Sequence, residues 1–99
     1  MKTVLITGAG IGIGRSTALA FSKKGYRVIV TDILKDEGAA VVSEINEDGG
    51  AAKFYFLDVT STENADNVVA SVEKEFGAID TIVCNAGIAH KVPLDQLTD

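Results

Sequence analysis

A glycine-rich stretch near the amino end holds the first residues whose types and spacing could bind a ligand. Four glycines fall between the apolar run at residues 4–6 and a helix-like segment that begins near residue 13; they are Gly8, Gly10, Gly12 and Gly14. Glycine lets backbone N–H groups approach a ligand without an intervening Cβ, and the first turn of the following helix adds partial positive charge. The stretch therefore predicts a loop that binds a diphosphate.

The spacing of the glycines distinguishes between classes of phosphate loop. The long-chain dinucleotide fingerprint needs glycines at i, i+2 and i+5, and no starting point in the stretch satisfies it. The P-loop of ATP-binding proteins comes closer, but Ala9 stands at its first position and Arg15 replaces its lysine. The pattern that does fit is Thr7-Gly8-x-x-x-Gly12-x-Gly14.

An acidic residue, Asp32, follows the second apolar run of the chain, residues 27–31. The dinucleotide-binding fold places a carboxylate there that accepts hydrogen bonds from the adenosine ribose hydroxyls. Such a carboxylate repels a 2′-phosphate by roughly 4 kcal/mol for unit charges about 4 Å apart at an effective dielectric constant of 20. Asp32 therefore favours NAD over NADP as the cofactor. An aspartate at this point can also cap the helix that follows, and both roles remain open.

Hydrophobic patterning predicts the elements that position these residues. Apolar, β-branched runs predict buried strands at residues 3–7, 27–31, 52–57 and 80–84. Helical spacing predicts helices over residues 13–24, 35–48 and 65–76, each followed by glycine. Thr60 and Glu63 fit a capping box before the third helix. This order predicts one α/β domain over residues 1–99, a Rossmann-type doubly wound parallel sheet with strand order 3-2-1-4, whose ligand crevice lies between the first and fourth strands.

Composition excludes several classes of partner. The chain has 99 residues, a formal net charge of −5 and no basic run, which argues against binding to nucleic acid or an anionic membrane. No apolar run approaches the roughly 20 residues that span a bilayer. Met1 leads directly into a strand rather than a signal sequence, and the single cysteine, Cys84, suits a reducing compartment. We therefore expect a cytoplasmic protein.

Taken together, the motifs resemble those of the short-chain dehydrogenase/reductase family. The glycine pattern matches that family's cofactor loop, and Asn85-Ala86-Gly87 matches its Asn-Asn-Ala-Gly motif except that Cys84 holds the first place. NADP-preferring members usually carry a basic residue where this chain has Ile11 or Ile33. The resemblance implies NAD as the cofactor and the following cofactor-binding residues: Gly8, Gly10, Ile11, Gly12, Ile13, Gly14, Asp32, Ile33, Asp58, Val59, Asn85, Ala86 and Gly87.

The resemblance also implies particular roles at the later strand ends. Asp58 would accept a hydrogen bond from the exocyclic amine of adenine while Val59 covers the ring, although Asp58 can also help to start the next helix. The side chain of Asn85 would tie the fourth strand to its neighbours. We expect Cys84 to be a buried, inert thiol and His90 to be an exposed loop residue, with a place at the nicotinamide end as its alternative.

The catalytic residues of the family are missing from this chain. The family uses a serine and a Tyr-x-x-x-Lys pair, whereas Tyr26 and Tyr55 are followed four places later by valines. No residue is therefore assigned to catalysis, and none to a metal. Residues 97–99 resemble the N-cap of the family's next helix, so the chain is expected to be the front part of a longer enzyme.

We therefore expect the NAD-binding part of an oxidoreductase that transfers hydride between a nicotinamide cofactor and an alcohol or carbonyl substrate. The alternatives are a stand-alone dinucleotide-binding or interaction module and one chain of a split enzyme. The expected partners are the nicotinamide dinucleotide and, for the complete enzyme, a small alcohol or ketone. Homo-oligomerisation, or pairing through the exposed edge of the fourth strand, is expected as well.

Overall fold

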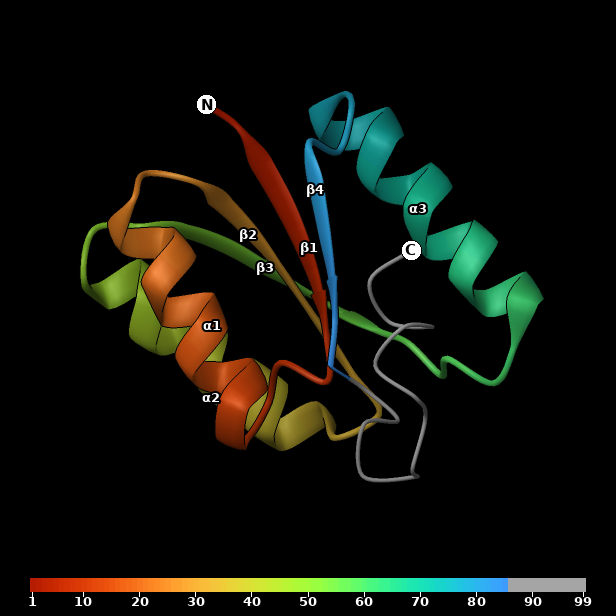
Figure 1. Ribbon diagram of the computed structural model, residues 1–99, viewed down its shortest axis with the longest axis horizontal. Helices are drawn as coiled ribbons and strands as arrows, with labels where there is room; N and C mark the ends of the chain where they lie inside the picture. Colours follow the sequence, from red (N-terminus) through yellow and green to blue (C-terminus); the bar gives the residue numbers. More distant parts are fainter. Residues whose placement is uncertain (86–99) are drawn as a thin grey trace.

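The computed structural model describes residues 1–85, which form one parallel sheet with helices on both faces (Figure 1). The strand order is β3-β2-β1-β4, so the predicted doubly wound fold and its order 3-2-1-4 are confirmed. The elements are β1 Thr3–Thr7, α1 Gly12–Lys23, β2 Arg27–Asp32, α2 Lys35–Glu47, β3 Ala51–Phe56, α3 Thr62–Phe76 and β4 Thr81–Cys84. The boundaries differ from the predicted ones by a few residues at most.

The sheet separates two hydrophobic cores, because successive residues of a strand point to opposite faces. Helices α1 and α2 cover one face and α3 covers the other (Figure 1). The core under α1 and α2 consists of Val4, Ile6, Ala9, Ala18, Val28, Val30, Val41 and Ile45. The core under α3 consists of Leu5, Ile29, Leu57, Val68 and Val72. Both central strands are therefore buried on both faces, which is why they read as continuous apolar runs.

Two glycines end helices as predicted. Gly25 and Gly77 follow α1 and α3 with φ of 88° and 90°, a region that favours glycine over residues with a Cβ. The N–H of Gly77 donates to the carbonyl of Glu73 at 2.9 Å, which satisfies a carbonyl of the last turn of α3. These turns return the chain to the sheet at the amino ends of β2 and β4.

The predicted capping box at Thr60 is wrong by one residue. Helix α3 begins at Thr62, and the hydroxyl of Ser61 accepts a hydrogen bond from the N–H of Asn64 at 3.1 Å. Thr60 instead bonds to the residue two places before it. Its N–H and its hydroxyl both donate to Asp58 Oδ1, at 2.9 and 2.6 Å. The N-cap of α3 is consequently Ser61, the next residue with a hydroxyl group in the sequence.

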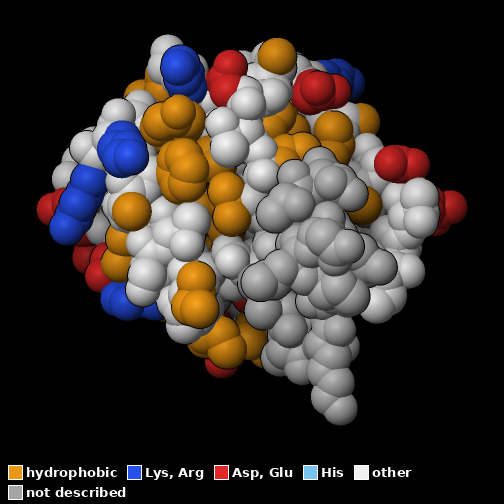
Figure 2. Space-filling view, viewed as in Figure 1, with side chains coloured by type: hydrophobic (Ala, Val, Ile, Leu, Met, Phe, Trp, Pro, Cys, Tyr) orange, Lys and Arg blue, Asp and Glu red, His pale blue; other side chains and the backbone are white. Residues whose placement is uncertain are grey.

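The surface is mixed in charge on the face seen in Figure 2. Basic and acidic side chains are interspersed around its rim, with hydrophobic side chains between them. This distribution agrees with the formal net charge of −5 and with the lack of a basic run in the sequence. Within residues 1–85, none of the helices has the length and apolar character that crossing a membrane would require.

Candidate functional site

The predicted binding residues leave the sheet at one edge. All four strands are parallel, so the segments that follow β1, β2, β3 and β4 start from the same end of the sheet (Figure 1). Strand β1 lies between β2 and β4, which places the glycine loop at the centre of that edge. Asp32 ends β2 beside the loop, and Asn85 follows β4 on its other side.

Direct hydrogen bonds join the glycine loop to the end of β2. The N–H of Gly10 donates to Asp32 Oδ2 at 2.9 Å, and the N–H of Ala9 donates to the carbonyl of Thr31 at 3.0 Å. The other carboxylate oxygen of Asp32 accepts from the N–H of Leu34 at 3.1 Å. Leu34 is the N-cap residue of α2. The carboxylate thus links the loop to the start of the next helix.

The Asp32 carboxylate keeps acceptor capacity beyond these two contacts. The residue is 8% exposed, and each carboxylate oxygen carries two lone pairs. Asp32 bonds the N–H of Leu34, but the N-cap of α2 is Leu34 itself and no side chain caps that helix, so the capping role considered for Asp32 is not present. Because two amides use only part of the four acceptor positions, these contacts do not prevent the same carboxylate from accepting hydrogen bonds from a ligand.

The glycines of the loop are required for different reasons. A Cβ on Gly14 would overlap the backbone carbonyl of Gly8, and one on Gly10 would lie 2.9 Å from Asp32 Oδ2. A Cβ on Gly12 would meet no atom within 4 Å, although its φ of 59° favours glycine. Gly10 and Gly14 therefore allow the loop to close on itself, whereas Gly12 borders open space.

The first turn of α1 contains backbone N–H groups that have no partner within the helix. The first hydrogen bond of the helical ladder runs from the N–H of Arg15 to the carbonyl of Ile11, at 3.3 Å. The N–H groups of Gly12 and Ile13 precede this bond and have no partner within the helix. This is the arrangement that binds phosphate at the N-terminus of a helix.

Large hydrophobic side chains at this edge are open to solvent. Ile11, Ile13 and Ile33 are 56%, 73% and 58% exposed, and Val59 after β3 is also exposed. These residues do not pack into either core. The edge therefore combines free amides, an acid and uncovered apolar surface, which are the features of a site for a ligand with both polar and apolar parts.

Asp58 stabilises the turn that follows β3. Its Oδ1 accepts from the hydroxyl and the N–H of Thr60, and these hydrogen bonds lower the pKa of the carboxyl group. The N–H of Asp58 donates to Asn64 Oδ1 at 2.6 Å. The predicted role of Asp58 in starting the next helix is therefore present, while its contact with adenine stays a prediction.

The residues after β4 differ in part from expectation. The N–H of Asn85 donates to Thr7 Oγ1 at 2.9 Å, so the main chain of Asn85 ties β4 to β1. The buried Nδ2 of Asn85 has no hydrogen-bond partner among the described residues. Cys84 is exposed and not buried as predicted, because β4 is the last strand in the order. Ala86, Gly87 and His90 lie outside the described residues.

Thr31 supports the site although it belongs to none of the sequence motifs. Its side chain is fully buried, and its hydroxyl donates to the carbonyl of Ile6 at 2.7 Å. Its own carbonyl accepts the N–H of Ala9. The available signal was a hydroxyl residue in an otherwise apolar buried run. Thr31 holds the exit of β1 against β2 and so supports the glycine loop.

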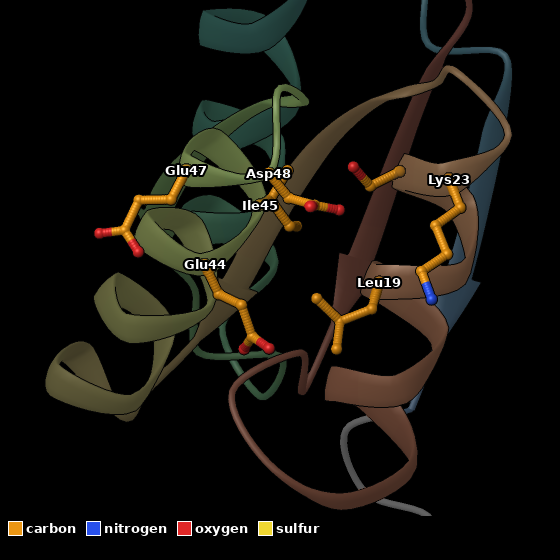
Figure 3. A pocket seen from close by; sticks show the side chains of 7 residues that line it. Leu19, Lys23, Glu44, Ile45, Glu47 and Asp48 are labelled. Atoms are coloured by element: carbon orange, nitrogen blue, oxygen red, sulfur yellow. The ribbon is translucent and has the colours of Figure 1, made fainter.

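A groove of about 370 Å³ lies elsewhere, between the C-terminal halves of α1 and α2. Leu19 and Lys23 of α1 face Glu44 and Ile45 of α2 and Asp48, which follows α2, across it (Figure 3). Its carboxylates would repel a phosphate, and none of the predicted binding residues lines it. Among the described residues no group of His, Cys, Asp and Glu is placed to hold a metal ion. We therefore place the candidate site at the carboxyl edge of the sheet.

Comparison with known proteins gives consistent matches along the chain. The sequence profile of a family described as short chain dehydrogenase matches residues 2–99. Galactitol 2-dehydrogenase from Agrobacterium fabrum is 42% identical over 98 residues, which cover 99% of this chain and 37% of that enzyme. A hydroxysteroid dehydrogenase from Escherichia coli matches in structure with a TM-score of 0.85 at 35% identity, covering 95% of this chain and 42% of that one.

A further solved structure contains a bound nucleotide. A candidate D-mannonate oxidoreductase from Haemophilus influenza, solved with NAD bound, has a TM-score of 0.78 at 31% identity. The match covers 82% of this chain and 29% of that protein. This chain therefore spans less than half the length of each of these three proteins.

Proposed function

The chain belongs to the short-chain dehydrogenase family, and from this premise we propose that it binds NAD at the carboxyl edge of its sheet. The complete protein would transfer hydride between the nicotinamide and an alcohol or carbonyl substrate. The observation that carries the proposal is the 2.9 Å hydrogen bond from the Gly10 N–H to Asp32 Oδ2. It brings the phosphate loop and the ribose-binding acid together at one point, as a dinucleotide requires.

Each part of the edge has a role in this proposal. The N–H groups of Gly12 and Ile13 would hold the pyrophosphate, because a helix N-terminus favours a negative charge. Asp32 would accept hydrogen bonds from the adenosine ribose hydroxyls, and Val59 would cover the adenine ring. The buried Nδ2 of Asn85, which bonds none of the residues 1–85, is a donor that this proposal assigns to the nicotinamide side of the loop. When bound, the nicotinamide supplies or accepts the hydride.

The choice of NAD over NADP is part of the proposal. Asp32 carries a negative charge next to the place of the ribose, and a 2′-phosphate there would be repelled. Ile11 and Ile33 provide no positive charge to balance that phosphate. The structural neighbour from Haemophilus influenza was solved with NAD, which supports the use of a nicotinamide dinucleotide within this group of proteins.

The chemical step needs residues that this chain does not contain. Neither Tyr26 nor Tyr55 is followed by a lysine four residues later. We propose that these 99 residues bind and orient the cofactor and that the proton-transferring residues come from other sequence.

Calorimetric titration of NAD and NADP tests the proposal. We expect NAD to bind more tightly than NADP, and Asp32→Ala to weaken NAD binding at least about tenfold, since two or more charged hydrogen bonds to the ribose are lost. The matched control is Asp66→Ala on α3, an exposed aspartate far from the loop, which should change the affinity less than about twofold. The site would be rejected if neither NAD nor NADP bound, and equal or tighter binding of NADP would reject the role of Asp32.

A further inference from the structure

We propose that Glu37, in the first turn of α2, is a second residue that selects against a cofactor with a 2′-phosphate. This inference rests on the proposed function and goes beyond it, because it assigns cofactor selection to a residue outside the predicted binding set. The specificity would then depend on two carboxylates from different elements, Asp32 at the end of β2 and Glu37 in α2.

The position of Glu37 follows from what surrounds Gly10. A Cβ built on Gly10 would lie 2.9 Å from Asp32 Oδ2, 3.1 Å from the Cβ of Glu37 and 3.3 Å from the N of Gly38. Asp32 and the stem of Glu37 therefore flank the same point of the glycine loop. A substituent on the ribose held by Asp32 would come close to the first turn of α2.

The start of α2 is held firmly in this place. A Cβ on Gly38 would overlap the ring of Phe54, so the helix lies directly against β3. The N–H of Gly38 donates to the carbonyl of Leu34 at 2.9 Å, and the N–H of Leu34 donates to Asp32 Oδ1. The first turn cannot move away from Asp32 without breaking these contacts. The backbone of Glu37 is therefore held at a defined place beside the loop.

The electrostatics of the first turn explain why this acid matters. The N-terminus of a helix attracts phosphate, so α2 alone would favour a 2′-phosphate beside Asp32. Its first turn instead carries Asp36 and Glu37, whose negative charges oppose that attraction. Of these two acids, Glu37 is the one whose Cβ is among the three atoms nearest to a Cβ built on Gly10.

The basic residues on neighbouring segments face other partners. The Lys35 ammonium lies 5.4 Å from the centre of the Phe56 ring, at the β3 edge. The Arg15 guanidinium bonds both carboxylate oxygens of Glu44, at 2.7 and 2.9 Å. Within residues 1–85, both of these cations therefore already contact other groups.

The test compares two substitutions in the same helix. Glu37→Gln removes the charge beside the loop, and Glu47→Gln removes an exposed charge at the opposite end of α2 as the matched control. Dissociation constants for NAD and NADP are measured by calorimetry on each variant. We expect the ratio of the NADP constant to the NAD constant to fall about three- to tenfold in Glu37→Gln and less than about twofold in Glu47→Gln.

Salt separates a charge effect from a packing effect. The difference between the two variants should shrink in about 0.5 M salt, because added ions screen exposed charges. A ratio in Glu37→Gln that stays within twofold of the control, while the unsubstituted protein binds NAD, would overturn the inference and leave the proposed function intact. A protein that binds neither nucleotide would instead overturn the proposed function, and this inference with it.

Discussion

Two regions of the sheet are held together by different kinds of contact. From the amino end of β2 and along the outer strand β3, charged and aromatic side chains contact one another beside α3. The Arg27 guanidinium lies 4.4 Å from the centre of the Phe76 ring. The Lys53 ammonium lies 2.6 Å from Glu75 Oε1, which also accepts a hydrogen bond from the Tyr55 hydroxyl at 2.9 Å. These side chains from β2, β3 and α3 satisfy one another.

At the carboxyl end, polar side chains bond mainly to the backbone. Asp32 accepts from two amides, the Thr31 hydroxyl donates to a carbonyl, and Thr7 accepts from the N–H of Asn85. Exposed apolar side chains such as Ile13 surround these contacts. The side chains at this end fix the path of the loop backbone, but they leave hydrophobic surface exposed to solvent.

The difference suggests that stability and binding are separable in this chain. Removing side chains that bond only to one another should lower the folding free energy alone. Changing residues that fix the path of the glycine loop should also change the affinity for a ligand. Substitutions in the two regions should therefore produce different combinations of stability loss and affinity loss.

Gly14→Ala should have the largest effect and should reduce both stability and binding, because the new Cβ would overlap the carbonyl of Gly8 within the loop. We expect the free energy of unfolding to fall by about 3 kcal/mol or more, with loss of NAD binding. Chemical denaturation and titration on the same samples measure both. A variant with unchanged stability would show that the contact of Gly14 with Gly8 does not constrain the fold.

Phe76→Ala should reduce stability without reducing the affinity for NAD. The substitution removes a half-buried ring that the Arg27 guanidinium covers and that packs against the core under α3. We expect a loss of about 2 kcal/mol in unfolding free energy, below the range for a fully buried phenylalanine. NAD affinity should stay within about twofold when measured well below the unfolding temperature. A large loss of affinity in folded protein would contradict the separation of the two regions.

Gly12→Ala should reduce the affinity for NAD with only a small loss of stability. Its Cβ would meet no protein atom, so the cost in stability is limited to about 1 to 2 kcal/mol from the backbone conformation at φ of 59°. The Cβ would instead occupy the space proposed for the pyrophosphate, and we expect NAD binding to weaken about tenfold or more. Comparison with Gly14→Ala distinguishes a glycine required by the ligand from one required by the fold.

Glu75→Gln should have the smallest effect, visible only as a change in pH dependence. Hydrogen bonds from Lys53 and Tyr55 lower the pKa of the Glu75 carboxyl group. A carboxyl whose pKa is lowered by folding adds stability above its unfolded pKa of about 4.3 and loses it as the pH falls through the folded pKa. Thermal unfolding from about pH 6 to pH 3 should therefore show a steeper decline for the unsubstituted protein than for Glu75→Gln.

The control for this experiment is Glu73→Gln, at an exposed position on the same helix. It should keep the steeper decline of the unsubstituted protein. Equal profiles for all three proteins would show that the contacts of Glu75 add no stability in solution.

The sequence predicted the parts of the fold that depend on local pattern. The apolar runs of β1 and β2 and the glycines that follow α1 and α3 are short-range signals, and the structure confirms them. The strand order followed from the alternation of strands and helices together with the handedness of crossover connections. The end of the sheet that carries the motifs was predictable for the same reason.

The sequence did not predict contacts that depend on exact geometry. Ser61 rather than Thr60 caps α3, because Asp58 had already engaged the Thr60 hydroxyl. The closeness of Glu37 to Gly10 depends on how α2 packs on Phe54, which no periodicity reveals. The cluster around Phe76 likewise joins residues from three separate elements.

The hydrogen bond between Gly10 and Asp32 makes the Gly10 amide proton a probe of folding in this part of the protein. It spans 22 residues and lies in a buried part of a loop, where the amide N–H depends on a side chain from another strand. The Gly10 amide should therefore exchange with deuterium as slowly as an amide within the sheet. During refolding, that amide would gain protection only after β2 has docked beside β1, so one loop proton records when the glycine loop and the end of β2 come together.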